Sequence, residues 1–146
     1  MTGDVANVKL LLKAGADASE GAPVAEAITF GHADVVRALI EAGADTGLTE
    51  SSGVNLMHWA TITGRSSVIP LLAKAGVPVN DKDKAGFTAL MYAATLDNGN
   101  TELLDALITA GADPLIPNPE GRNAFEQATL FQHSTLSTKA SSRFRK

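Results

Sequence analysis

The chain has few side chains that could carry out chemistry, and their spacing argues against a catalytic centre. His32 and His58 lack a third ligand or an acidic partner at the spacing of a metal site or a catalytic triad. Asp81 and Asp83 alternate with lysines in a turn-like stretch, which favours a solvated tip over an acid/base pair. Cysteine is absent, and so are the motifs of nucleotide-binding loops and zinc proteases. We therefore expect no enzyme activity, no cofactor and no metal. An enzymatic turnover that is abolished by substitution of His58 would contradict this interpretation.

Charge and hydropathy narrow the class of protein further. All sixteen acidic residues and eight of the twelve basic ones precede residue 133, so this part carries a net charge of −8. That sign disfavours nucleic-acid binding. No apolar run approaches the roughly 18–20 residues that span a bilayer, and the first residues do not resemble a signal peptide. We expect a soluble, cytoplasmic, monomeric domain without membrane contact.

The elements that position these side chains follow an internal repeat. Four glycine pairs, each twelve residues apart, enclose GDVANVKLLLKAG, GHADVVRALIEAG, GRSSVIPLLAKAG and GNTELLDALITAG. Apolar residues recur three and four apart in each string, which predicts a short helix. The second glycine, as in AGAD, predicts the helix end, and polar residues such as Asn7 and Asp34 are expected to accept amides near the start. Pro70 is compatible with a helix that begins near Ser66.

A second helix pattern precedes three of these strings and recurs once more near the end of the chain. It reads APVAEAITFG, NLMHWATITG, TALMYAATLDNG and NAFEQATLF, and its alanines suit close helix contact. The segments between units, GVPVNDKDKAGFT and GADPLIPNPEGRN, are rich in turn formers and predict extended turns or hairpins. The sequence thus predicts an all-α chain of stacked helix-turn-helix units.

The stretch GVPVNDKDKAGFTALMYAA, from Gly76 to Ala94, resembles the ankyrin repeat, and the 33-residue spacing from Gly31 to Gly64 is also that of this family. The resemblance implies an ankyrin-repeat solenoid over residues 1–131, with units at about 1–19, 20–47, 48–80, 81–115 and 116–131. A basic tail over 132–146 is expected to be disordered or a linker, with a motif for a membrane or an acidic partner as the alternative. The resemblance also gives His58 a structural role, a hydrogen bond to backbone between neighbouring hairpins, and makes His32 part of a turn.

The repeats depart from the family pattern at several places. Unit one begins at its second helix, and the hairpin between units one and two is largely deleted between Asp17 and Ala22. Two extra residues fall in TLDNG, between the helices of unit four. Pro117 and Pro119 stand where a hairpin of unit five would need amide donors.

The resemblance implies a protein-binding module whose contacts come from the hairpin tips and the concave face of the first helices. We predict that Val54, Phe87, Ile62 and Leu96 form the apolar centre of the site. Trp59 and Tyr92 share a column with Glu26 and Gln127, and serve either as core packing or as an aromatic strip bordering the concave face. The full set of predicted contact residues is Thr49, Ser51, Ser52, Val54, Trp59, Ile62, Lys82, Lys84, Ala85, Phe87, Tyr92, Leu96, Pro119, Glu120 and Arg122. The acidic units favour a neutral or basic protein partner. The alternative function is that of a scaffold or regulatory segment of a larger enzyme or membrane protein.

Overall fold

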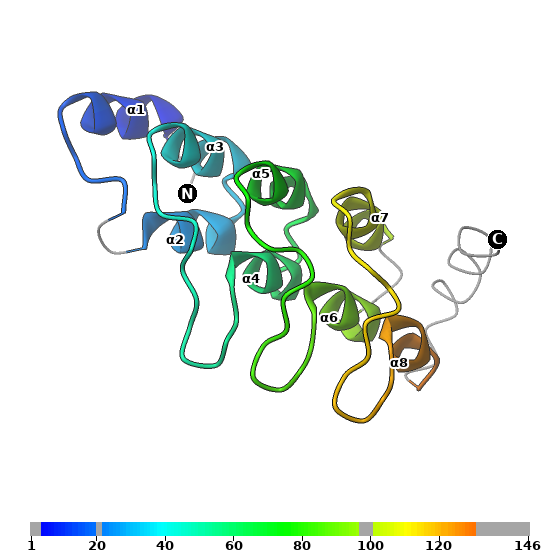
Figure 1. Cartoon of the computed structure of the whole chain (residues 1–146). Helices are drawn as coiled ribbons and strands as arrows, with labels where there is room; N and C mark the ends of the chain where they lie inside the picture. Colours follow the sequence, from blue (N-terminus) through cyan, green and yellow to red (C-terminus); the bar gives the residue numbers. More distant parts are fainter. Residues whose placement is uncertain (1–3, 20–21, 97–100, 131–146) are drawn as a thin grey trace.

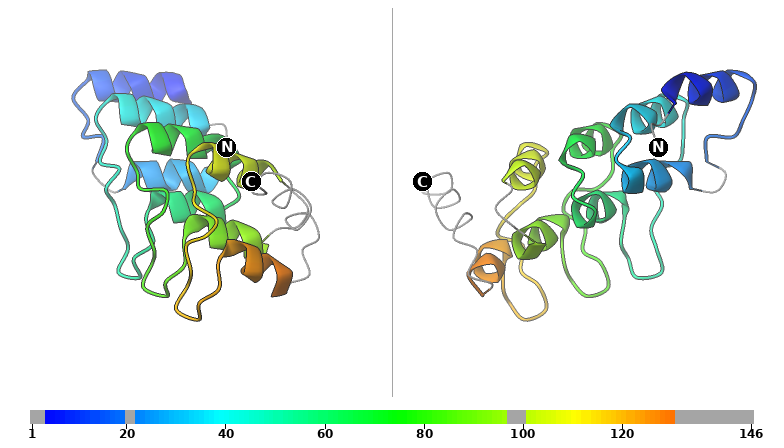
Figure 2. Two further views of the ribbon diagram at one scale, coloured as in Figure 1. Left: turned by 45° about the vertical axis from the view of Figure 1, so that its right-hand side comes forward. Right: turned by 180° about the vertical axis from the view of Figure 1, so that it is seen from behind.

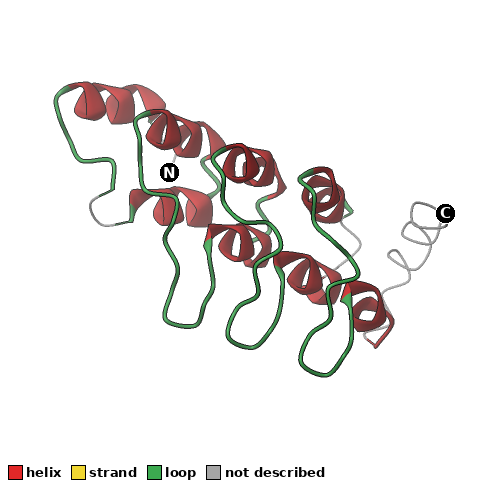
Figure 3. Ribbon diagram, viewed as in Figure 1, coloured by secondary structure: helices red, strands yellow, loops and turns green. Residues whose placement is uncertain are grey.

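Short helices alternate with long connections throughout the computed structural model, which describes residues 4–19, 22–96 and 101–130. The helices are α1 (Val5–Lys13), α2 (Pro23–Phe30), α3 (Ala33–Glu41), α4 (Leu56–Ile62), η1 (Ser66–Val68), α5 (Ile69–Lys74), α6 (Ala89–Leu96), α7 (Glu102–Thr109) and α8 (Ala124–Leu130). Within these ranges no strand forms, and one isolated bridge joins Thr49 and Asn55 (Figure 3). The predicted tail and the extra residues of unit four lie outside the described residues.

The helices form two stacked rows. One row contains α2, α4, α6 and α8, which we call the first helices, and the other contains the second helices α1, α3, α5 and α7 (Figures 1 and 2). Three long loops project on the side of the first helices (Figure 1). This arrangement confirms the predicted all-α solenoid, in which each unit buries its apolar face against its neighbours.

The repeated glycines end the second helices, as predicted. Gly43 has a φ of 85°, in the left-handed region that glycine adopts without steric cost. Its amide donates to the Ile40 carbonyl at 3.0 Å, and the next amide, from Ala44, reaches Leu39 at the same distance. Gly15, Gly76 and Gly111 are also left-handed. AGAD is therefore a helix C-cap.

The helix starts differ from the prediction. In α1 the cap is Asp4, which accepts the Asn7 amide at 3.2 Å, so Asn7 donates rather than accepts. At α3 the cap position belongs to His32, which makes no capping bond with its side chain, and Asp34 accepts only the adjacent amide of Val35. Pro70 lies in the first turn of α5, directly after η1, as predicted.

The core is built from small and aliphatic side chains where the rows meet. Ala60 and Ala94 are fully buried on the first helices and allow close helix contact, while Ile28, Met57 and Met91 fill the space between units. Burying each such large aliphatic side chain contributes about 1.5–3 kcal/mol. With a core so distributed, every unit depends on the neighbour that covers it.

Candidate functional site: tips and first-helix face

The three projecting loops end in the same turn. We call them tip three (residues 49–54), tip four (residues 82–87) and tip five (residues 117–122). In each tip, a backbone amide donates a hydrogen bond to the carbonyl four residues later and closes the turn. These bonds join Glu50 to Val54 at 2.9 Å, Asp83 to Phe87 at 2.9 Å and Asn118 to Arg122 at 2.8 Å. One backbone frame thus presents three different sets of side chains.

The prolines of tip five do not disrupt its turn, contrary to the prediction. Asn118, between them, supplies the amide that the turn needs, and its side-chain oxygen accepts the amide of Arg122 at 2.9 Å. Pro119 occupies the position after it, where the fixed φ of proline suits a turn. Its ring lies directly against Gly86 of tip four, where any Cβ would be 2.4 Å from the Pro119 Cδ.

Neighbouring tips are joined by hydrogen bonds as well as by packing. The amide of Lys84 donates to the carbonyl of Ser52 at 2.9 Å, which fastens tip four to tip three. The Lys82 ammonium donates to the carbonyl of Pro117 at 2.6 Å and reaches tip five in the same way. The tips therefore form a connected row.

His58 has the structural role that the family resemblance implied. It is 1% exposed, and its Nε2 lies 3.0 Å from the carbonyl of Phe87 at the base of tip four. The amide of Asn55 lies 3.3 Å from Nδ1, which is also 2.8 Å from the side-chain oxygen of Asn55, so the ring joins the start of α4 to tip four. His32 is part of the turn before α3 and stacks on Phe30, with ring centroids 6.4 Å apart.

Asp83 is buried, whereas the alternating charges of its segment predicted a solvated tip. Its Oδ1 accepts the amide of Phe87 at 2.9 Å, and its Oδ2 accepts the hydroxyl of Tyr92 at 2.6 Å. Burial, with this hydrogen bond and the charge of Asp83, raises the pKa of Tyr92 to about 12. Asp81 is exposed, as expected. The two carboxylates thus have separate environments and do not form an acid/base pair.

The aromatic column lies at the boundary between core and surface. Trp59 and Tyr92 are both partly buried, so the column is neither pure core nor a fully exposed strip. The indole N–H of Trp59 donates to the Thr29 hydroxyl at 2.9 Å, which links unit three to α2. In the same column Glu26 is exposed, and Gln127 is buried beside Arg122, whose Nε donates to it at 2.9 Å.

The predicted contact residues lie at the two ends of the first helices, except Trp59 and Tyr92, which lie within α4 and α6. The tips, which include Val54 and Phe87, lie where the first helices begin. Ile62 and Leu96 are the last residues of α4 and α6, and they are 39% and 51% exposed. Phe87 packs on Tyr92, with ring centroids 5.6 Å apart, so it is only partly accessible. The exposed members of the set are Thr49, Ser51, Ser52, Ile62, Lys82, Lys84, Ala85, Leu96, Pro119 and Glu120, and Val54, Trp59, Phe87, Tyr92 and Arg122 are partly buried.

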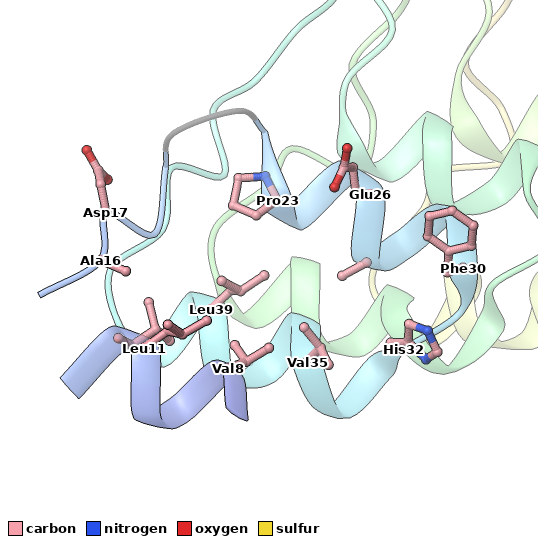
Figure 4. A pocket seen from close by; sticks show the side chains of 12 residues that line it. Val8, Leu11, Ala16, Asp17, Pro23, Glu26, Phe30, His32, Val35 and Leu39 are labelled. Carbon is pink, nitrogen blue, oxygen red and sulfur yellow. The ribbon is translucent and has the colours of Figure 1, made fainter. Parts of the chain in front are cut away.

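A hollow at the N-terminal end of the solenoid was not predicted from the sequence. Figure 4 shows Leu11, Phe30 and His32 around it, between α1, α2 and α3, and its volume is about 360 Å³. Phe30 is 65% exposed and Leu11 61%. Phe30 stands two repeats of 33 residues before Leu96, so the repeat register could have identified it. Among the described residues no first helix covers this side of α2.

Other kinds of site find no support in the part of the chain that the structure describes. No group of three or more His, Asp or Glu side chains is arranged to hold a metal ion. None of the described helices has the length and apolar character required to cross a bilayer.

Comparison with known proteins agrees with this geometry. The family model for ankyrin repeats in three copies matches residues 1–83, 24–118 and 57–137. The chain therefore belongs to the ankyrin repeat family.

Relatives with this repeat are much longer proteins. Palmitoyltransferase Hip14 of Drosophila melanogaster is 32% identical over 102 residues, which cover 69% of this chain and 16% of the relative. Human palmitoyltransferase ZDHHC13 is 28% identical over 111 residues, covering 75% of this chain and 18% of the relative. The ankyrin repeat and KH domain-containing protein mask-1 of Caenorhabditis elegans is 36% identical over 100 residues, 68% of this chain and 4% of the relative. The chain thus spans less than a fifth of the length of these relatives.

Proposed function

We propose that the chain is a non-catalytic protein-binding module that contacts its partner with the tips and the face of the first helices. The observation that carries the proposal is the uniform backbone of the three tips beneath dissimilar, exposed side chains. In a solenoid such side chains can vary without loss of the fold, because the scaffold bonds come from the backbone and from buried residues such as His58. The net charge of −8 before residue 133 favours a neutral or basic partner surface.

Affinity capture with matched surface variants tests this function. Leu96→Asp places a charge at the exposed end of α6, while Leu115→Asp does the same at a leucine that is 68% exposed in a connection outside the predicted site. We expect the proteins bound by the wild type to be lost with Leu96→Asp and kept with Leu115→Asp, both variants showing native circular dichroism. Identical bound sets for all three proteins would show that the proposed face is wrong. Leu96 suits this test better than Phe87, whose ring supports Tyr92.

The second candidate function is that of a scaffold or regulatory segment within a larger enzyme or membrane protein. Two of the relatives named above are palmitoyltransferases, and the aligned region is 16–18% of each. Under this reading the same surface holds a substrate or regulator for a catalytic part elsewhere in the protein. Sequencing the gene on both sides of the region that encodes this chain tests the second function. A reading frame that continues into a catalytic or membrane-spanning segment supports it, and in-frame stop codons directly before and after this region overturn it. A cytoplasmic location remains a prediction.

A further inference from the structure

The row of tips has an open end beside unit two. The connection from α1 to α2 is short, because Gly3 and Gly31 are 28 residues apart instead of 33. No tip precedes tip three among the described residues (Figure 3). Within the described residues, the side of tip three that faces α2 therefore lacks the covering that tip three itself gives to tip four.

A narrow slot lies at this open end. It has a volume of about 180 Å³ and runs between the start of α2 and tip three. Ala22 and Ala25 line it on one side, and Leu48, Val54 and Trp59 line it on the other. Pockets for small molecules have volumes of about 300–1,000 Å³. The slot is therefore suited to one apolar side chain of a longer molecule.

The contact between tips three and four indicates which backbone group can meet an occupant. Tip four donates the amide of Lys84 to the carbonyl of Ser52. Ser51 stands 33 residues before Lys84, in the equivalent place of tip three, and its amide donates to no atom of the described residues. An extended segment in the slot can supply the missing carbonyl acceptor, as in the recognition of peptides along an exposed strand edge.

The charge at the slot selects the type of segment. Glu50 occupies the position of Asp83 and Asn118, but these two are 8% and 4% exposed whereas Glu50 is exposed and lines the slot. Glu50 forms no ion pair with any described residue, and its carboxylate approaches only the Ser52 hydroxyl, at 3.4 Å. A lysine or arginine of the occupant would give this carboxylate a partner.

We propose that the slot binds an extended basic peptide segment of a protein partner. One apolar side chain enters between Ala25 and Trp59, a backbone carbonyl accepts the amide of Ser51, and a cationic side chain two residues away pairs with Glu50. Residues two apart share a face of an extended chain, so both side chains point toward the protein. This inference rests on the proposed protein-binding function and names the class of partner.

Nuclear magnetic resonance of the ¹⁵N-labelled chain tests the proposal with defined probes. The probe is acetyl-Lys-Thr-Leu-Thr-Lys-amide, and the controls replace both lysines by glutamate or the leucine by serine. The single tryptophan gives one indole N–H signal, at the edge of the slot. We expect the basic peptide to shift this signal and the Ser51 amide at low salt, with a Kd of about 1 mM, which is weak binding. The control peptides should shift neither signal.

Two substitutions distinguish the slot from general charge attraction. Glu50→Lys and Glu41→Lys change the net charge equally, but Glu41 lies at the end of α3, away from the slot. We expect Glu50→Lys to weaken peptide binding about tenfold and Glu41→Lys to leave it unchanged. Ala25→Leu should also block binding, because the leucine side chain fills the slot, and leucine is a good enough helix former to keep α2.

The outcomes that overturn the proposal are distinct. Equal effects of Glu50→Lys and Glu41→Lys, equal binding of the acidic peptide, or no shift with about 5 mM peptide would show that the slot does not select a basic segment. Shifts of the same signals with protein concentration alone would assign the slot to a second copy of the chain. A failed titration leaves the general binding function intact if Leu96→Asp still abolishes capture, so the two failures can be told apart.

Discussion

The hydroxyl of Tyr92 is predicted to hold tip four onto α6, and Tyr92→Phe isolates its contribution. The phenylalanine ring keeps the contacts with Phe87 and His58, whose centroids lie 5.6 and 6.0 Å away. Only the 2.6 Å hydrogen bond to Asp83 is lost. Hydrogen bonds to charged groups contribute about 1.5–3 kcal/mol. Tyr92 is partly exposed, so we expect the free energy of unfolding to fall by the lower figure, about 1.5 kcal/mol, in urea denaturation.

Asp83→Asn is the matched variant for a double-mutant cycle. Asparagine already occupies this place in tip five, where Asn118 accepts the amide of Arg122, so the turn itself should survive. The single substitutions should show a coupling of about 1 kcal/mol, because each removes the bond between the Tyr92 hydroxyl and the charged carboxylate of Asp83. Fully additive losses would refute the proposed bond between Tyr92 and Asp83.

The same contact predicts how stability depends on alkaline pH. The pKa of Tyr92 is raised from 10.0 to about 12, which means that the folded chain holds this proton more tightly than the unfolded chain. The resulting stabilisation is complete below pH 10 and is lost as the pH rises towards 12. Tyr92 is the only tyrosine, so tyrosinate absorbance reports it alone.

The absorbance titration can refute this reasoning directly. Ionisation near pH 10 in a chain with native circular dichroism would show that Tyr92 is neither buried nor bonded as described. In Asp83→Asn the pKa of Tyr92 should fall yet stay above its usual value, because burial is the largest cause of its shift. A complete return to the usual value would make the carboxylate the main cause instead.

Three further predictions concern the scaffold, and urea unfolding measures each. Gly43→Val should cost about 1–2 kcal/mol from left-handed strain alone, since no atom lies within 4 Å of the added Cβ. Gly47→Ala, at a glycine without positive φ, should cost less, and equal losses would contradict the capping role. Gly86→Ala should lower the free energy of unfolding more than Gly43→Ala does, because its Cβ meets the ring of Pro119. Adding Pro119→Gly to the Gly86→Ala chain should recover the extra loss. If stability does not recover, the clash with Pro119 is refuted. His58→Ala should cost about 2–4 kcal/mol by leaving backbone groups of two units unpaired, and a loss below 1 kcal/mol would contradict that link.

The scaffold could be predicted from the sequence because its signals are local and periodic. Gly43 and its counterparts end helices through their own backbone, and Pro70 is tolerated by its position in a first turn. His58 was placed by the family pattern, and the bond to Phe87 confirms it. Each of these roles depends on residues in the same unit or at the same place in the next one.

The environment of the tips was harder to predict because it depends on how each turn folds back. The alternation of Asp83 with lysines indicates solvation, but the turn directs its carboxylate to the Phe87 amide and to Tyr92, nine residues later. The prolines of tip five appeared to remove donors, yet Asn118 alone provides the one that the turn needs.

One feature of the slot beside tip three can be predicted from the sequence, and another cannot. The shortened spacing from Gly3 to Gly31 is visible in the sequence. The wall formed by Trp59 is not, because its orientation depends on a hydrogen bond to Thr29, thirty residues earlier.

The hydrogen bonds between units have a consequence for how the chain acquires its structure. Among the described residues, side-chain hydrogen bonds that join neighbouring units connect positions 26 to 36 apart, from Asp45 with Ser19 to Arg65 with Thr29. These bonds form between segments that are close in the sequence, which corresponds to a low contact order. A low contact order favours rapid folding. During synthesis, a unit can settle onto its predecessor once about one further repeat has left the ribosome. When the two ends of the chain are pulled apart, the units should unfold one at a time, because each is bonded only to its neighbours.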